Sequence, residues 1–277
     1  MENNLSIREI LEWYVTAGVD ETFGEVPFGL EAPKPKAEPA PRPVLTTRAE
    51  DSVAPRAATT DLAQATISAC KNARELCAEA QTLEELREMV EKFEGCALKL
   101  TANKTVFGGG NPNSKIMLVG EAPGADEDRI GLPFVGRSGQ LLDKMLKAVN
   151  VDRTSCYITN VLPWRPPGNR TPTDGEIAVC LPFLKRQIEL INPEVIVVLG
   201  GSAANALLDN EEPISRLRGK WLEYRKSDGK TVPVLASFHP AYLLRNAAQK
   251  AKAWTDLLRM QQKIICLLYT SDAADGK

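Results

Sequence analysis

The apolar positions of the chain form two kinds of run, and each kind predicts a different element. Short, nearly continuous runs of β-branched and aliphatic residues predict strands over residues 115–121, 156–162, 195–201 and 232–238. Longer stretches with apolar residues every three or four positions predict helices over residues 138–149, 173–191, 202–208 and 241–265. Strands that are apolar throughout are buried on both faces, so this alternation predicts a parallel sheet covered by helices, with ligands at the carboxyl ends of the strands.

The part of the chain before these elements has a different pattern. Residues 5–18 have apolar positions near helical spacing and predict a short amphipathic helix, whereas residues 27–55 are rich in Pro and Ala and predict a disordered linker. Residues 60–92 are again helical in pattern, and Thr82 followed by Glu85 predicts a capping box. We therefore expect an N-terminal helix and linker over residues 1–59 and a folded domain over residues 60–265.

The carboxy-terminal residues do not fit the rest of the sequence. The segment CLLYTSDAAD, residues 266–275, resembles the in-frame translation of a sequencing adapter. We interpret residues 266–277 as an assembly artefact, so the true last residues are missing; the alternative is a natural tail.

Charge is distributed unevenly along the chain. The net charge is −2 overall, but residues 1–92 carry −7 and residues 93–265 carry +6. A modest positive excess on the folded part is compatible with phosphate contacts, although many proteins that never touch DNA carry as much. No run is long and apolar enough to span a membrane and no signal peptide is evident, so we expect a cytoplasmic, reducing location.

The first motif that carries chemistry is GEAPGADEDRIGLPFVGRSGQLLD, residues 120–143. Its glycines have neither Walker nor dinucleotide-binding spacing. It instead combines an aromatic residue, Phe134, with a dense group of carboxylates: Glu121, Asp126, Glu127 and Asp128. A loop that only cradled phosphate would avoid these negative charges, so the motif indicates a different ligand.

The second motif is CYITNVLPWRPPGNRTP, in which Asn160 ends a predicted strand. A side-chain amide offers one donor group and one acceptor, which match O4 and N3–H of uracil but not the corresponding edge of cytosine. The alternative is an asparagine that caps the next turn.

The third motif is SFHPAYLLRN, which contains His239, the only histidine of the chain. His239 follows a predicted strand and precedes a proline, so its loop can place a hydrogen-bond donor in a pocket. The alternative is a histidine satisfied within the core.

These three motifs, in this order and spacing, resemble the family 4 uracil-DNA glycosylases, and especially an alphaproteobacterial-type branch, over about residues 93–265. The resemblance implies a three-layer α/β/α domain with a four-stranded parallel sheet. It also implies a monomeric, monofunctional enzyme of base excision repair, which flips uracil out of DNA and hydrolyses its N-glycosidic bond to leave an abasic site. No covalent-capture loop rich in Lys, Arg and His lies between Asn160 and Pro172, which favours hydrolysis.

The resemblance assigns roles around the base. Phe134 would stack on the flipped uracil, Asn160 would bind its pairing edge, and His239 would donate to O2. Glu127 would lie near C5, where a thymine methyl group would collide.

The resemblance also assigns roles around the sugar and the DNA. Ala122 and its neighbours would lie beside the sugar and the attacking water, and the residue that activates this water stays open among Glu121, Asp126 and Asp128. The expected DNA contacts are phosphate binding by Ser138, Gly139 and Arg170, and a wedge formed by Leu243, Leu244 and Arg245.

Family 4 enzymes usually hold an iron-sulfur cluster on four cysteines, and this chain departs from that pattern. Alignment with the family motifs puts Cys96 and Cys180 at two ligand positions, but Phe93 and Trp164 at the other two. Two thiolates cannot make the usual four-ligand site, so we expect no cluster, no metal and no other cofactor.

Three functions are therefore weighed against one another. The first is an active uracil-DNA glycosylase, and the second is a protein that binds uracil or abasic DNA with little turnover. The third, a nucleotide hydrolase of the same fold class, lacks a phosphate-binding or metal-binding motif.

Overall fold

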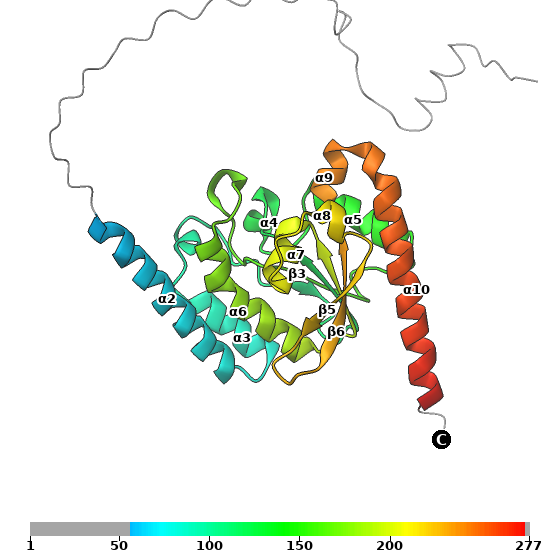
Figure 1. Ribbon diagram of the computed structural model, residues 1–277, viewed down its shortest axis with the longest axis horizontal. Helices are drawn as coiled ribbons and strands as arrows, with labels where there is room; N and C mark the ends of the chain where they lie inside the picture. Colours follow the sequence, from blue (N-terminus) through cyan, green and yellow to red (C-terminus); the bar gives the residue numbers. More distant parts are fainter. Residues whose placement is uncertain (1–55, 275–277) are drawn as a thin grey trace, which may run out of the picture. The chain divides into compact units, whose positions relative to one another are not determined.

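A six-stranded sheet lies at the centre of the computed structural model, which describes residues 56–274 (Figure 1). Its strands, in the spatial order β1-β3-β2-β4-β6-β5, are β1 (Gly109–Gly110), β2 (Ile116–Gly120), β3 (Tyr157–Asn160), β4 (Val195–Leu199), β5 (Trp221–Arg225) and β6 (Thr231–Ser237). The four inner strands are parallel, whereas β1 and β5 pair antiparallel at the two edges. The predicted four-stranded parallel sheet is confirmed as the centre, and two edge strands are added to it.

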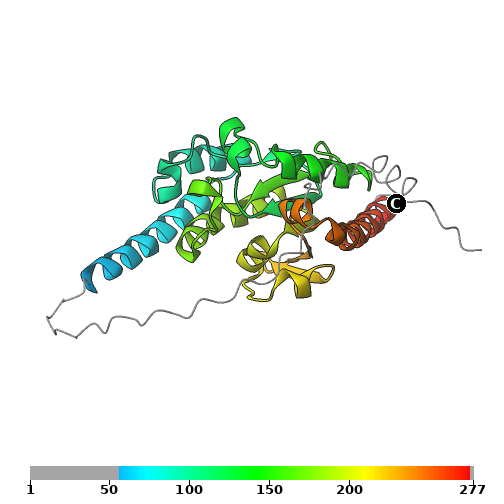
Figure 2. The ribbon, with the colours of Figure 1, turned by 90° about the horizontal axis from the view of Figure 1, so that it is seen from above.

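Helices cover both faces of the sheet. They are α2 (Arg56–Glu79), α3 (Leu83–Lys92), α4 (Ala125–Ile130), α5 (Arg137–Lys147), α6 (Asp174–Ile191), α7 (Gly201–Leu208), α8 (Ile214–Leu217), α9 (Pro240–Arg245) and α10 (Lys250–Ala274). In β2, Met117 and Val119 pack with side chains of α6 and α7, while Ile116 and Leu118 pack with side chains of α5 and α10. Figures 1 and 2 show the sheet between these two groups of helices, so the three-layer α/β/α fold is confirmed.

The predicted helix over residues 241–265 is wrong as a single element. Helix α9 ends at Arg245, a short 3-10 turn follows over Ala247–Gln249, and α10 begins at Lys250. The break lies at Asn246, whose backbone (φ −133°, ψ 75°) is not helical. The apolar periodicity continues across this break because both helices pack against the same face of the domain, so periodicity alone could not reveal it.

The helical stretch predicted over residues 60–92 is also divided in two, between α2 and α3. Thr82 starts α3, its hydroxyl accepts from the Glu85 amide at 3.1 Å, and the Glu85 carboxylate accepts from the Thr82 amide at 3.2 Å. The predicted capping box is therefore confirmed, and it marks the division between the two helices.

The expectations for the two ends of the chain have different outcomes. The helix and linker expected over residues 5–18 and 27–55 lie outside the described residues. The backbone of α10 continues to Ala274, into the segment interpreted as an adapter product. In the described part of the chain, no helix is both long and apolar enough to cross a membrane.

The carboxyl ends of the parallel strands meet at one edge of the sheet. Gly120 at the end of β2 pairs with Asn160 at the end of β3, and Leu199 of β4 pairs with Ser237 of β6. Residues that follow these strands are therefore collected at one place, although they are far apart in sequence.

Candidate active site

A cleft of about 460 Å³ lies at this edge of the sheet. It is lined by residues from all three sequence motifs, including Glu121, Glu127, Phe134, Asn160 and His239. Its volume is within the range usual for small-molecule sites. The fold therefore brings the three motifs together at one cleft, as the sequence predicts.

The Phe134 ring and the Asn160 amide meet over the backbone of Gly120. A Cβ atom at Gly120 would lie 2.4 Å from Asn160 Oδ1 and 2.6 Å from Phe134 Cζ, so only glycine permits this approach. Asn160 is 4% exposed, and its side-chain amide has no hydrogen-bond partner among the described residues. The amide therefore caps no turn in this part of the chain, and its donor and acceptor are free to bind a ligand.

His239 faces the Phe134 ring, with 5.5 Å between the two ring centroids. Its Nδ1 accepts a hydrogen bond from the Ala241 amide at 3.1 Å. The pKa of His239 is lowered from 6.5 to about 4, mainly by burial and also by the nearby Arg245, whereas Glu127 opposes the shift. The imidazole is therefore neutral at pH 7, and its proton is on Nε2, which makes Nε2–H a donor.

Glu121 follows β2 directly and lines the cleft. Burial raises the pKa of its carboxyl group above the usual 4.5, while a hydrogen bond with Ser202 at the start of α7 lowers it. Ser202 thus contacts the carboxylate from the end of a neighbouring strand.

Glu127 joins the two loops that form one wall of the cleft. Its carboxylate accepts from the backbone amides of Gly124 at 3.1 Å and of Val135 and Gly136 at 2.9 Å each. The side chain is buried, so these three charge-assisted bonds hold the loops against α4.

The structure corrects the placement of Asp126 and Asp128, two of the three candidates for water activation. Asp128 is 1% exposed and its carboxylate accepts from the Asn103 amide at 2.7 Å, whereas Asp126 is exposed and pairs with Arg129 at 3.2 Å. Neither lines the cleft. Successive helical residues are about 100° apart, so α4 can direct Glu127 into the site only by turning its two neighbours away.

Of the three residues predicted to hold phosphate, two line the cleft and one is buried outside it. Ser138 and Arg170 line the cleft, and Arg170 also makes a bidentate ion pair with Glu176 at 2.9 and 2.6 Å. Gly139 is buried instead: a Cβ atom there would lie 1.8 Å from the Phe134 carbonyl oxygen. The structure therefore corrects Gly139 from a DNA contact to a residue that makes room for the Phe134 backbone.

The predicted wedge is smaller than the sequence suggested. Leu244 is 43% exposed and Arg245 lines the cleft, but Leu243 is 1% exposed and packs with Phe238 and Ala253. Leu243 is thus a core residue of α9, and Leu244 and Arg245 remain as candidates to contact DNA.

Comparison with known proteins agrees with this geometry. The family model of the uracil DNA glycosylase superfamily matches residues 107–258. The chain is 43% identical over 176 residues to a type-4 uracil-DNA glycosylase of Thermotoga maritima, covering 62% of this chain and 88% of that protein. It is 45% identical over 168 residues to a type-4 uracil-DNA glycosylase of Archaeoglobus fulgidus, covering 59% and 84%. This chain belongs to the type-4 uracil-DNA glycosylases.

At the four positions where the resemblance predicts cluster ligands, the side chains of this chain do not fit a four-thiolate cluster. The sulfur atoms of Cys96 and Cys180 lie 3.9 Å apart, and both side chains are buried. The rings of Phe93 and Trp164 stack with 6.4 Å between centroids, and Phe93 packs edge-on against Phe183 at 5.1 Å. Packed aromatic rings thus stand at two of the four positions where the resemblance predicts cluster ligands, and no group of three or more potential metal ligands is assembled in the described residues.

Three residues that support the site were not singled out from the sequence: Gly120, Ser202 and Arg153. Gly120 and Ser202 follow the rule that functional residues collect at strand ends, so that rule could have found them. Arg153 lies outside the three motifs, and its contacts appear only in the folded chain.

Proposed function

We propose that this glycosylase excises uracil from DNA as a monofunctional enzyme of base excision repair, leaving an abasic site. The observation that carries the proposal is the convergence of the Phe134 ring, the Asn160 amide and the His239 imidazole on one cleft. Such an enzyme must first extrude the target nucleotide, which costs least when the base is mispaired, so uracil opposite guanine should be a good substrate.

Phe134 and Asn160 select the base. Stacking on an aromatic ring does not discriminate between pyrimidines, so the choice of uracil depends on the amide. Asn160 donates to O4 and accepts from N3–H, a pair that cytosine cannot match. A mismatched base leaves buried polar groups unpaired, at roughly 1–3 kcal/mol each.

His239 stabilises the leaving group. As the glycosidic bond breaks, negative charge grows on uracil, and the Nε2–H of the neutral imidazole donates to O2. A fixed donor that binds the developing anion better than the neutral base lowers the barrier rather than merely tightening binding.

Glu121 acts at the sugar. The deoxyribose becomes cation-like as uracil departs, and a nearby carboxylate stabilises it and accepts a proton from the attacking water. Ala122 lies beside Glu121 in the same wall of the cleft. Of the three carboxylates considered for water activation, Glu121 is the one that borders the cleft.

Ser138, Arg170 and Arg245 bind the DNA backbone around the cleft, and Leu244 contacts the base stack. We propose that this chain belongs to an alphaproteobacterial-type branch and holds no cluster and no metal, because Phe93 and Trp164 stand where two of the four ligands are expected. We also propose that the enzyme acts on uracil-containing DNA as a monomer and is located in the cytoplasm. Its folded domain is proposed to span residues 60–265.

The test is excision from an end-labelled oligonucleotide with one uracil, followed by alkali. Strand cleavage at the uracil is expected, and the same oligonucleotide with thymine is the control. The competing function, binding with little turnover, predicts a retarded complex without cleavage, and that result would overturn the proposal.

A further inference from the structure

The backbone of Phe134 has a conformation that aromatic residues rarely adopt. Its φ is +53°, in the left-handed region, which costs a non-glycine residue on the order of 1–3 kcal/mol. Such a conformation persists only where neighbouring groups hold it. The direction of the Cα–Cβ bond of Phe134 follows from this backbone, so the groups that hold the turn also determine where the ring can lie.

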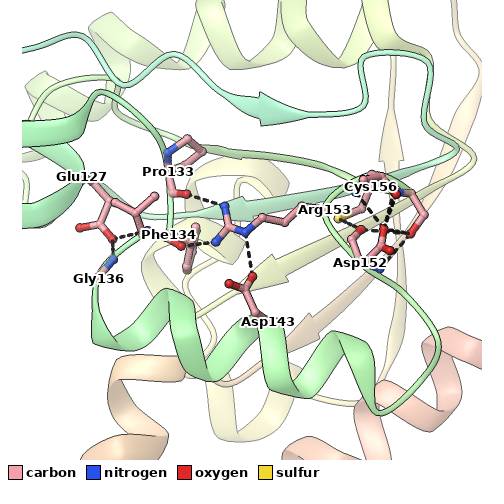
Figure 3. Close-up of polar contacts among 11 residues, drawn as sticks. Glu127, Pro133, Phe134, Gly136, Asp143, Asp152, Arg153 and Cys156 are labelled. Carbon is pink, nitrogen blue, oxygen red and sulfur yellow. Dashed lines mark hydrogen bonds and ion pairs between the residues drawn. The ribbon is translucent and has the colours of Figure 1, made fainter.

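Arg153 binds the two carbonyl groups around this turn (Figure 3). Its Nη1 donates to the Pro133 carbonyl at 3.1 Å, and its Nη2 donates to the Phe134 carbonyl. The planar guanidinium can bind two acceptors at once, which lysine cannot reproduce in the same geometry.

The opposite side of the turn is held by Glu127. Its Oε1 accepts from the amides of Val135 and Gly136, the two residues that follow Phe134. Gly139 leaves space for the Phe134 carbonyl. The turn is therefore bound through its carbonyls on one side and through its amides on the other.

Arg153 is itself fixed in place. Its Nε donates to Asp143 of α5 at 2.8 Å. It belongs to a turn in which the Asp152 carboxylate accepts from the Thr154 amide at 2.8 Å, and the Cys156 thiol donates to the Asp152 carbonyl at 3.0 Å (Figure 3). The guanidinium is thus anchored to β3 and α5 before it reaches the Phe134 turn.

We infer that Arg153, oriented by Asp143, is a positioning residue that fixes the Phe134 ring as the platform for the extruded uracil. The inference rests on the stacking role proposed for Phe134. Arg153 is absent from the residues that line the cleft, so it acts through Phe134 and not by touching the base. Small displacements of a positioned group can cost catalysis on the order of 100-fold.

The test compares Arg153→Gln with a matched control, Arg186→Gln. Arg186 also joins a carboxylate, Glu189 at 2.8 Å, to a backbone carbonyl, Ala80 at 2.6 Å, but on α6 and away from the cleft. We expect both variants to lose thermal stability, and only Arg153→Gln to lose kcat, on the order of 10-fold to 100-fold. Arg153→Lys, which keeps the charge but has a single donor nitrogen in place of the planar fork, should be intermediate.

A double-mutant cycle with Phe134→Ala tests the route of the effect. If Arg153 acts through the ring, then Phe134→Ala combined with Arg153→Gln is no slower than Phe134→Ala alone. Affinity for DNA without uracil, and its salt dependence, should not change in Arg153→Gln, whereas loss of a phosphate contact would reduce the salt slope by about 1.

The outcomes separate this inference from the proposed function. If Phe134→Ala is impaired but Arg153→Gln excises uracil as fast as Arg186→Gln, the positioning role is wrong and the stacking role stands. Additive losses in the double variant, or a lower salt slope, would also overturn it. If Phe134→Ala has wild-type activity, both the stacking role and the role of Arg153 fail.

Discussion

Base selection at the residue scale depends on the Asn160 amide, and Asn160→Asp tests it. A carboxylate accepts hydrogen bonds but does not donate to O4, so we predict that uracil excision falls roughly 10-fold to 100-fold, which corresponds to about 1–3 kcal/mol for one lost buried bond. Cytosine presents a donor where uracil presents O4, so preference should move towards cytosine. Excision of both bases from matched oligonucleotides measures this, and unchanged selectivity in a folded variant would remove the assignment.

His239 gives a pH prediction. Its pKa of about 4 lies below the ordinary 6.5, so the imidazole stays neutral and donating, and no change in kcat from His239 is expected between about pH 5 and 8. A measured inflection near pH 6.5 that disappears in His239→Gln would contradict the neutral assignment.

The same shift affects stability. The folded state favours the neutral imidazole, whereas the unfolded chain protonates it below its ordinary pKa of 6.5. The contribution of His239 to the free energy of unfolding is therefore fully present above pH 6.5 and is lost as the pH falls towards 4. We predict that wild-type protein loses more thermal stability than His239→Gln between pH 7 and pH 4, by roughly 3 kcal/mol at most. Parallel losses in the two proteins would show that His239 does not titrate in this way.

At the scale of elements, Glu127 holds α4 to the turn before α5, so its substitution has two effects. Glu127→Ala removes the acceptor of three backbone amides and should reduce stability by about 3 kcal/mol or more, at roughly 1 kcal/mol or more for each unpaired amide. It should also relax the exclusion of thymine. Glu127→Gln, which keeps one carbonyl oxygen, should be more stable than the alanine variant. Thermal unfolding and thymine excision check both effects.

The elements that were predicted correctly are those whose local pattern and tertiary environment agree. The apolar runs of β2 and β4 are buried in every residue, so composition reveals them. Strand β5, in contrast, is mostly exposed, and the two glycines of β1 have no side chains to form a pattern. These edge strands are held by pairing with a neighbour, which a local window of sequence does not contain.

The residues of the candidate site also divide into those that the sequence predicts correctly and those that depend on the folded chain. Phe134, Asn160 and His239 were predicted to act together because they lie in distinctive motifs at strand ends, and they do line one cleft. Asp126 and Asp128 could not be separated from Glu127 by composition, since only the direction of α4 decides which carboxylate enters the site. Arg153 was missed because its effect is a contact across 19 residues, not a feature of its own surroundings in sequence.

On the scale of the whole molecule, one face of the sheet carries an aromatic cluster where relatives are expected to carry iron and sulfur. Phe93, 3% exposed, packs against Trp164 and Phe183 beside the thiols of Cys96 and Cys180. Hydrophobic packing is then what joins the segment around α3 to α6. The stability of the domain should depend on the rings and not on a metal.

Two single variants, Phe93→Ala and Cys96→Ala, test whether aromatic packing stabilises the domain where a cluster is expected in the family. Removing a buried ring costs about 3–5 kcal/mol, so we predict a large loss of stability in Phe93→Ala, measured by thermal or urea unfolding. Cys96→Ala removes a small buried group and should cost much less, without changing absorption or iron content. If a cluster were present, the order would reverse: Cys96→Ala would lose colour, iron and stability together, since a thiolate ligand would be gone. Iron analysis of protein purified without oxygen supplies the remaining control, because a cluster lost to air would otherwise give the same result as a cluster never bound.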